Sequence, residues 1–346
     1  MTRKRSGRVF VQIAAYRDPE LGPTLRDCLG QARYARDLRF GICWQRGDDE
    51  RFPLRRDDAR FRVDEVPWRD SQGLGWARSR ISRLYEGEEY TLQLDSHHRF
   101  ARHWDAALFD MVEQTGSPRP IISTYATAYA PNRLRAVETR DRRLYRMVAD
   151  RFTDAGTILF RPHYVTCSER PMPARFVSGH FFFTVGRHCE DYRYDPGIYF
   201  AGDEISLSVR SFTLGYDLYR PGRTLVWHEY TREGRPKHWD DHTTERSLAG
   251  DVEAPWHERN SHSVERLGQL LGYGDRGIDL GRTGLGTART LREYELFAGI
   301  DFRNRRLHPY TTAGYDPPNP ADPEWQAGLT RDRAGEPTGS FARQAV

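Results

Sequence analysis

Lysine, cysteine and long apolar runs are scarce in this sequence of 346 residues. Lysine occurs only at positions 4 and 237, so arginine supplies nearly all of the 53 basic residues. The four cysteines are widely spaced and form no CxxC pair. A disulfide framework is arithmetically open to them, but in a long chain without a secretion signal we expect reduced thiols. No apolar run approaches the length that spans a bilayer, which predicts no membrane segment.

The N-terminal residues also lack the features of a targeting signal. The basic start, MTRKRSGR, passes directly into a strand pattern. It has neither the apolar stretch nor the small-residue cleavage site of a signal peptide. We therefore expect a cytoplasmic protein that does not associate with membranes.

The net charge of +4 raises the question of nucleic-acid binding. Arginine is interleaved with aspartate and glutamate almost everywhere, as in RDRRLYRMVADRFTD. Recognition of a nucleic acid requires a basic patch with interleaved aromatic residues, and none stands out. We expect no nucleic-acid partner and attribute the arginine content to a coding bias.

Strand and helix patterns alternate at short intervals through the first 130 residues. Short apolar runs predict strands over residues 9–15, 38–45, 61–68, 90–95 and 120–129. Apolar faces of helical period predict helices over residues 73–87 and 103–116. Another helix should follow the first strand, with Asp18 as its N-cap and Pro19 as its first residue. The alternation predicts an α/β fold with a mostly parallel central sheet flanked by helices.

The second half of the chain is less regular. Between residues 130 and 170 we expect loops with two short strands, one of them at 151–160. A core strand over 176–186, a helix over 203–216 and a strand–turn–strand over 217–230 should follow, with short helices after residue 250. Residues 306–346 are rich in Pro, Gly, Asp and Arg, and are expected to form an irregular tail.

The stretch LQLDSHHRF places Asp95, Ser96 and His97 directly after a predicted strand. Ligands on mainly parallel sheets bind beyond the carboxyl ends of strands. The carboxylate of Asp95 and the imidazole of His97 are donors that suit Mn²⁺, with Mg²⁺ as the alternative. A solvated turn with a stray histidine is the competing interpretation, and the apolar strand and the second histidine favour the metal.

A third ligand is needed, and His228 in TLVWHEY is the best-placed candidate because it also follows a short apolar strand. The alternative is a structural histidine packed among neighbouring aromatic rings. His238 and His242 are four residues apart and could share a helical face. Their spacing suggests a zinc hydrolase, but the glutamate of the H-E-x-x-H motif is absent.

Two further clusters have a functional and a structural interpretation. Asp203 and Glu204 precede a predicted helix, where an acidic pair could accept hydrogen bonds from sugar hydroxyls or could simply cap the helix. The stretch GLGWARSR opens a helix with two glycines and places Arg78 one turn inside it. This arginine could pair with a phosphate, although arginine is so abundant here that chance is a serious alternative.

Taken together, several blocks resemble the Skp1-type hydroxyproline N-acetylglucosaminyltransferases. The blocks occur in the family's order between about residue 9 and about residue 303 and read IAAYRDPELGPTLRDCL, LRFGICWQ, QGLGWARSRISRLYEGEEYTLQLDSHHRF, FAGDEISLSVRSFTLGYDLYRPGRTLVWHEY and KHWDDH. More distantly, the sequence is similar to the polypeptide N-acetylgalactosaminyltransferases, whose metal motif is also D-S-H.

The resemblance implies a GT-A fold over residues 1–305, a UDP-sugar donor, a divalent cation, Mn²⁺ or Mg²⁺, and a retaining transfer to a hydroxyl acceptor. Asp95 and His97 match the motif that holds the metal, and His228 matches the later histidine of the set. Ser96 lies within the same motif and is assigned to donor binding.

The resemblance also implies roles for three other groups of residues. The segment near the nucleotide is matched by Tyr16, Arg17 and Asp18. The G-x-x-x-A-R block near the donor is matched by Gly73, Ala77 and Arg78. The acidic motif near the sugar and the acceptor is matched by Asp203 and Glu204, which are the candidate catalytic residues.

The leading hypothesis is therefore a metal-dependent transferase of N-acetylglucosamine, or of a related sugar, to a protein, a peptide or a small molecule. A metal-dependent nucleotide-sugar or phosphoester hydrolase would use the same cation. A non-catalytic sugar-binding or nucleotide-binding protein is disfavoured because the predicted ligand set is complete. The loop region between residues 130 and 170 offers no motif that identifies the acceptor.

Overall fold

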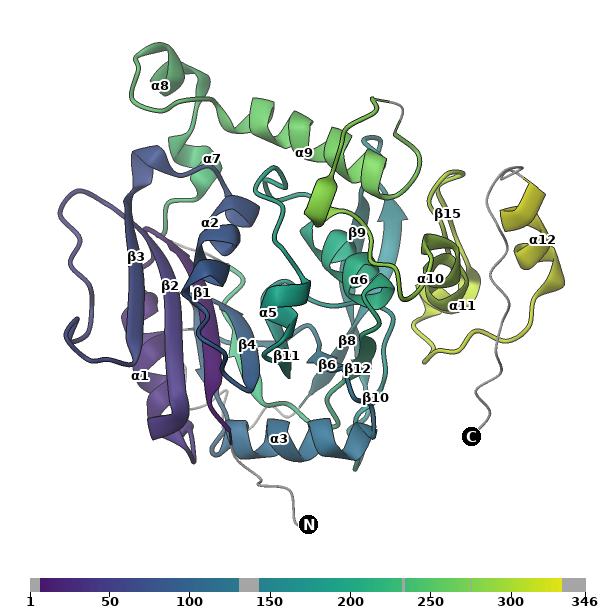
Figure 1. The fold of residues 1–346 in the computed structure, drawn as a ribbon, viewed down its shortest axis with the longest axis horizontal. Coiled ribbons are helices and arrows are strands. Elements are labelled where there is room, and N and C mark those ends of the chain that lie inside the picture. The colour runs from purple at the N-terminus through teal and green to yellow at the C-terminus, as the bar shows by residue number, and fades with distance from the viewer. Residues whose placement is uncertain (1–6, 131–142, 232–233, 275, 332–346) are drawn as a thin grey trace.

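An eight-stranded sheet forms the centre of the molecule (Figure 1), with the strand order β10-β12-β6-β11-β4-β1-β2-β3. The computed structural model describes all residues except 1–6, 131–142, 232–233, 275 and 332–346. The strands are β1 (Val9–Tyr16), β2 (Leu38–Arg46), β3 (Phe61–Pro67), β4 (Tyr90–Asp95), β6 (Pro120–Ser123), β10 (Met172–Pro173), β11 (Phe181–Val185) and β12 (Asp217–Arg220).

The predicted mostly parallel sheet is confirmed. Strands β4, β1, β2 and β3 are parallel neighbours, and β12 is parallel to β6. By contrast, β11 is antiparallel to β4 and to β6. In the parallel half, Ala14 of β1 pairs with Asp95, and Tyr16 pairs with Gln45 of β2. The carboxyl ends of three strands therefore meet at one edge, where ligands of such sheets bind.

Helices cover both faces of the sheet because successive side chains of a strand point to opposite sides. Val9, Val11 and Ile13 pack in one buried cluster with residues of α1 (Leu21–Gln31) and α3 (Trp104–Thr115). The intervening Phe10 packs on the other face with α2 (Leu74–Ile81). On that face, α6 (Asp203–Thr213) packs against the β11 half of the sheet. The result is a three-layer α/β arrangement (Figure 1).

A second, small sheet lies beyond the carboxyl end of β4. Its strands are β5 (His98–Phe100), β13 (Val226–His228) and β7 (Thr127–Ala128), with β13 in the middle. One prediction needs correction here, because the strand expected over 120–129 divides into β6 and β7, which belong to different sheets. The strand–turn–strand expected over 217–230 is confirmed as β12 and β13, and these two strands also belong to different sheets. In both cases the chain leaves the large sheet to complete the small one.

Between β7 and β11 the structure is more regular than the sequence predicted. Strands β8 (Leu144–Phe152) and β9 (Ile158–Val165) form an antiparallel hairpin. The strand expected over 151–160 is wrong, because these residues contain the turn of the hairpin, where Gly156 has a φ of 85°. The part of the expected loop at 131–142 lies outside the described residues.

The C-terminal region, expected to be irregular, contains defined elements as far as residue 331. Strands β14 (Ile300–Asp301) and β15 (Arg306–Leu307) pair, and α11 (Pro309–Ala313) and α12 (Pro323–Arg331) follow. Residues 332–346 lie outside the described part. The remaining helices are α5 (His188–Asp191), α7 (His238–Asp241), α8 (Thr244–Leu248), α9 (Trp256–Leu270) and α10 (Leu291–Ala298).

The start of one helix and the end of another differ from the predictions. The first helix begins at Leu21 with Glu20 at the N-cap position, so Asp18 lies in the turn before the helix, where its Oδ1 accepts from the Glu20 N–H at 2.9 Å. Helix α2 ends at Ile81, well before Gly87, and continues as a 3₁₀ turn over Ser82–Leu84. All four cysteines are free thiols, as expected. Within the described residues, no helix has the length and apolar character needed to cross a membrane.

Candidate functional site

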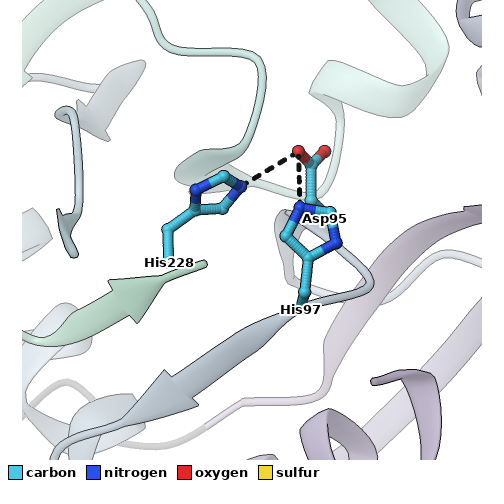
Figure 2. A group of neighbouring side chains, drawn as sticks. All are labelled: Asp95, His97 and His228. Carbon is cyan, nitrogen blue, oxygen red and sulfur yellow. Dashed lines mark hydrogen bonds and ion pairs between the residues drawn. The ribbon is translucent and has the colours of Figure 1, made fainter. Parts of the chain in front are cut away.

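Three side chains that could bind a metal converge at the carboxyl end of β4 (Figure 2). One potential ligand atom from each of Asp95, His97 and His228 lies within 4.8 Å of the others. The Nε2 atom of His228 is 3.3 Å from Oδ2 of Asp95, and Nε2 of His97 is 3.7 Å from the same oxygen. Among the described residues, this is the only group of three or more such side chains close enough to hold an ion.

The backbone explains why these residues meet. Strand β4 ends at Asp95, a tight turn carries Ser96 and His97, and β5 begins at His98. Strand β13 pairs antiparallel with β5 so that His228 is opposite His98. The hydroxyl of Thr24 on α1 holds the turn by donating to the Ser96 carbonyl at 2.8 Å and accepting from the His98 N–H at 2.9 Å. The sequence therefore places both histidines by pairing two short strands.

The electrostatics of the cluster suit a cation. Burial, and next the neighbouring His180, lower the pKa of His228 well below its usual value, so this imidazole is neutral at pH 7. Burial opposes ionisation of Asp95, but the hydrogen bond from His228 and the neighbouring His97 and Arg78 hold its pKa well below its usual range. The Nε2 atom of His97 is buried without a hydrogen-bond partner. One carboxylate and two imidazoles are a donor set that Mn²⁺ accepts.

Asp18 lies behind this cluster. Its Oδ2 atom is 2.8 Å from Nδ1 of His97 and accepts a hydrogen bond from Ser96 Oγ at 2.5 Å. Arg235 donates to the same oxygen at 2.8 Å. Burial alone would raise the pKa of Asp18, but its hydrogen bond with His97, the charge of Arg235 and the hydrogen bond from Ser96 lower it far below its usual value. Asp18 and Ser96 also line the adjoining cavity, so they lie where a ligand was expected.

This first cavity has about 740 Å³ of open space beside the metal cluster. Its walls come from the ends of β1, β2 and β4, from the start of α2 and from the segment before α7. The lining residues are Ala14, Tyr16, Asp18, Gln45, Gly73, Leu74, Asp95, Ser96, His97, Tyr199, Phe200, Arg235, Pro236, Lys237, His238 and Trp239.

Tyr16 and Arg17 are both tied to Asp241 at the rim of this cavity. The Tyr16 hydroxyl donates to Asp241 Oδ2 at 3.0 Å, and the Arg17 guanidinium is 2.7 Å from the same oxygen. Tyr16 lines the cavity, but Arg17 does not, and its guanidinium lies over the Trp68 ring. Arg17 therefore anchors the α7 segment through Asp241, and the ligand contact expected for it stays a prediction.

The three residues of the G-x-x-x-A-R block occupy different environments in the structure. Gly73 lines the first cavity, whereas Ala77 is completely buried in an apolar cluster and reaches neither cavity, which corrects the ligand contact expected for it. Arg78 is only 3% exposed, donates to the carbonyl of Gly179 at 2.6 Å and forms an ion pair with Asp203. Arg78 therefore supports Asp203, although it also lines a second cavity.

The second cavity has about 1210 Å³ of open space and shares Leu74, Asp95 and Phe200 with the first. Asp203 and Glu204, at the start of α6, both line it. Asp203 is paired with Arg78, whereas the half-buried Glu204 lines the cavity and forms no ion pair with a cation of the described residues. Burial, and next the negative charge of Asp203, raise the pKa of Glu204 to about 7.

Aromatic side chains that the sequence analysis missed form the opposite wall of the second cavity. The His180 ring lies 4.4 Å from the His228 ring, centroid to centroid, and the Tyr230 ring lies 4.3 Å from it. The other aromatic lining residues are Tyr125, Tyr145, Phe160 and Phe200. His180 precedes β11 at the strand's amino end, where the rule about carboxyl ends gives no signal. Arg235 was missed because arginine is everywhere.

His238 and His242 lie side by side, as their spacing predicted. Their rings stack with centroids 3.8 Å apart. His238 Nδ1 lies 2.9 Å from the Tyr199 hydroxyl, and His242 Nε2 lies 3.0 Å from the Trp68 carbonyl. Neither residue belongs to the metal-binding group, so the pair does not support a zinc hydrolase.

Comparisons with known proteins found solved structures that resemble this chain to different degrees. GalNAc-T7, solved with UDP, GalNAc and Mn²⁺, has a TM-score of 0.51 and 17% sequence identity, over 78% of this chain and 53% of that one. This chain therefore spans about half the length of GalNAc-T7. TarS 1-349 from S. aureus has a TM-score of 0.44 and 10% identity, over 76% of this chain and 72% of that one. No curated protein is significantly similar in sequence.

The fold is of the GT-A glycosyltransferase type, as predicted. The sequence also matches the family described as Glycosyltransferase (GlcNAc) over residues 8–60 and 54–304. This match includes every residue of the metal cluster and of the two cavity walls. The chain belongs to the GlcNAc glycosyltransferase family.

Proposed function

We propose that this chain is a metal-dependent glycosyltransferase that moves a sugar, with N-acetylglucosamine as the leading candidate, from a UDP-sugar to a hydroxyl acceptor. The observation that carries the proposal is the cluster of Asp95, His97 and His228 at the junction of two cavities. The family match supports the sugar transfer, and the UDP, GalNAc and Mn²⁺ in the GalNAc-T7 structure support the donor type and the cation.

In this proposal, Asp95, His97 and His228 hold Mn²⁺ or Mg²⁺. When bound there, the cation supplies Lewis-acid stabilisation of the negative charge that a departing diphosphate gains. The first cavity takes the nucleotide. Lys237 on its wall places positive charge beside the acidic ligands, which favours a polyanionic guest, whereas the charge of Arg235 is compensated by Asp18 and Glu229. Gly73 permits close packing at the start of α2, because a Cβ at this position would collide with the ring of Tyr199, which lines the same cavity.

The second cavity takes the acceptor and part of the transferred sugar. Because the two cavities meet at Asp95, an acceptor hydroxyl can reach the anomeric carbon from the side on which UDP departs. The anomeric C–O bond to UDP breaks with its electron pair on the phosphate oxygen, which then takes the proton of the attacking hydroxyl. The acceptor oxygen forms the new bond, and the α configuration is retained. Glu204 orients a hydroxyl of the sugar or the acceptor, and Asp203, held by Arg78, supports it.

We also propose that residues 1–305 form the catalytic unit, since the family match ends at residue 304. The resemblance to the Skp1-type enzymes adds a hydroxyl acceptor on a protein, a peptide or a small molecule to this proposal. No feature of the second cavity's described walls selects among these.

The test is UDP release from a panel of UDP-sugars with Mn²⁺, measured with and without hydroxylated acceptors that include hydroxyproline peptides and simple glycosides. We expect UDP-GlcNAc to be the best donor, EDTA to stop the reaction and Mn²⁺ to restore it. An acceptor that is used should stimulate UDP release and carry an α-linked sugar by NMR. UDP release that no acceptor stimulates would instead identify a hydrolase.

A further inference from the structure

The Asp18 carboxylate is buried behind the metal cluster, with only 5% of its side chain exposed. Four groups surround it. Oδ2 is close to Ser96 Oγ at 2.5 Å, His97 Nδ1 at 2.8 Å and an Arg235 nitrogen at 2.8 Å, and Oδ1 accepts from the Glu20 N–H at 2.9 Å. A carboxylate with so many donors stays ionised, so it acts only as an acceptor.

The Asp18 carboxylate determines which tautomer the His97 ring adopts. Because Asp18 can only accept, the proton of a neutral His97 ring must reside on Nδ1, and Nε2 keeps its lone pair. Nε2 is the buried atom without a hydrogen-bond partner, and it lies 3.7 Å from Asp95 Oδ2. The ring is thus held in the tautomer and the orientation that a metal ligand requires. A carboxylate behind a ligating histidine commonly serves this purpose.

Arg235 connects Asp18 to the segment that carries His228. It pairs with Asp18 through one guanidinium nitrogen and with Glu229 through another. Glu229 follows His228 directly, and its backbone N–H donates to the His97 carbonyl at 3.2 Å. The side chains of Asp18, Glu229 and Arg235 are at most 7% exposed. A closed ring of interactions therefore joins the two segments that carry the two histidines.

We propose that Asp18 and Arg235 are positioning residues for the metal: Asp18 sets the tautomer of His97, and Arg235 fixes Asp18 against the segment that follows His228. The proposal rests on the proposed function for the identity of the ion, but the tautomer of His97 does not depend on it. Loss of such a supporting carboxylate typically weakens metal binding by about 10- to 100-fold.

A purely structural ion pair would behave differently. Removing one partner of a buried pair lowers stability because the other charge is left without compensation. A structural role therefore predicts a lower melting temperature, but an unchanged His97 ring and an unchanged metal affinity in the protein that remains folded. The two roles are separated by measurements on the ring and on the metal, made at a temperature where every variant is folded.

The test uses Asp18→Asn, which leaves Arg235 paired with Glu229, together with the double variant Asp18→Asn/Arg235→Met, which removes both positioning side chains. Asp27→Asn is the matched control, since Asp27 is a partly buried carboxylate on α1 that accepts the Phe100 N–H at 2.7 Å and lies outside the metal cluster. Imidazole ¹⁵N spectra of the metal-free protein report the tautomer, with His97→Gln to assign the His97 signals. Titration with Mn²⁺ alone, followed by electron paramagnetic resonance, gives the metal affinity.

We expect a single Nδ1–H tautomer of His97 in the unmodified protein and in Asp27→Asn. In both Asp18 variants we expect a mixture of tautomers and Mn²⁺ binding that is about 10- to 100-fold weaker. Unchanged ¹⁵N shifts and Mn²⁺ affinity in folded Asp18→Asn would overturn the inference. If the unmodified protein binds no Mn²⁺ while the tautomer still shifts, the metal in the proposed function is overturned and the control of His97 by Asp18 stands.

Discussion

The Nε2 atom of His228 lies 3.3 Å from Oδ2 of Asp95, although the two residues are 133 positions apart (Figure 2). Two short strands create this contact, because β13 pairs with β5 only three residues after Asp95. Neither strand is long enough to be stable alone. Their pairing is held by the larger sheet, by Thr24 and by the Glu229 contact to His97. The candidate metal site therefore depends on the tertiary pairing of β13 with β5 and on the local motif of Asp95, Ser96 and His97.

Replacing Asp95 by alanine should abolish the metal dependence of UDP binding. The variant removes the only carboxylate of the cluster, and two neutral imidazoles hold a hard cation poorly. We expect calorimetry with UDP and Mn²⁺ to give the weak affinity that the unmodified protein shows in EDTA. The circular dichroism spectrum should be unchanged, because Asp95 is at the rim of two cavities. Asp110→Ala, an exposed position on α3, is the control, and unchanged UDP–Mn²⁺ affinity in Asp95→Ala would reject the site.

How well the sequence predicted the fold depended on how locally each element is determined. Strands β1 to β4 were located to within a residue or so at most ends, because strands buried on both faces read as apolar runs. The small sheet was not predicted. Thr127–Ala128 and Val226–His228 are short and belong to it only through pairing partners far along the chain. The hairpin of β8 and β9 was expected only as two short strands among loops, because neither sequence shows a clear alternation of apolar and polar residues.

The residues of the candidate site also differ in how well the sequence alone could identify them. Asp95 and His97 could be found because two donors directly follow an apolar strand, and His228 could be named as a candidate for the same reason. The partners of Asp18 and Arg78 could not be predicted. An ion pair between Arg78 and Asp203 depends on the packing of α2 against α6, which no local pattern encodes. Ala77 was assigned to ligand binding by its place in a motif, yet the packing of α2 buries it.

Replacing Glu204 by glutamine should lower turnover much more than it lowers nucleotide affinity. Glu204 lines the second cavity and not the first, so it is placed to contact the sugar or the acceptor. An amide keeps the shape but loses the charged acceptor. Once a donor is identified, we expect kcat to fall by about 10²-fold, the order of the loss when a reacting group is misplaced. The Kd for UDP with Mn²⁺ should stay within a few-fold, and equal losses in both quantities would place Glu204 elsewhere.

The stability of the metal-free protein should carry the pH signature of Glu204. Its pKa is raised to about 7, chiefly by burial, so the folded state holds a proton that the unfolded state has released. Stability from this group is present below its unfolded value of about 4.3 and is lost as the pH rises toward 7. Urea unfolding between pH 5 and pH 8 should therefore show a smaller loss of stability in Glu204→Gln than in the unmodified protein. Parallel pH profiles of the two proteins would contradict the raised pKa.

The buried pair of Arg78 and Asp203 should be much more important for stability than a neighbouring pair on the same helix. Arg78→Met leaves the 6% exposed Asp203 carboxylate without its cation, which typically costs about 3–5 kcal/mol. The matched variant, Arg80→Met, breaks a pair with Asp64 whose side chains are 32% and 22% exposed, and such pairs contribute about 0–1 kcal/mol. Urea unfolding measures both. Equal effects of the two substitutions would show that Asp203 does not depend on Arg78.

Alanine substitutions of Gly73 and Gly87 distinguish the effect of backbone strain from the effect of a changed shape of the first cavity. Gly73 has a φ of 107° and Gly87 a φ of 86°, so alanine is strained at both positions, at a cost of order 1–3 kcal/mol each. Only at Gly73 would the added Cβ meet another side chain, with Tyr199 Cδ2 at 2.5 Å, and Tyr199 also lines the first cavity. The new methyl group at Gly87 would meet nothing within 4 Å. We therefore expect both variants to lose stability, with the larger loss in Gly73→Ala, and only this variant to bind UDP and Mn²⁺ more weakly in calorimetry. If Gly73→Ala retains full affinity, the nucleotide does not occupy the cavity beside Tyr199, because displacement of that ring would weaken the binding of a ligand in contact with it.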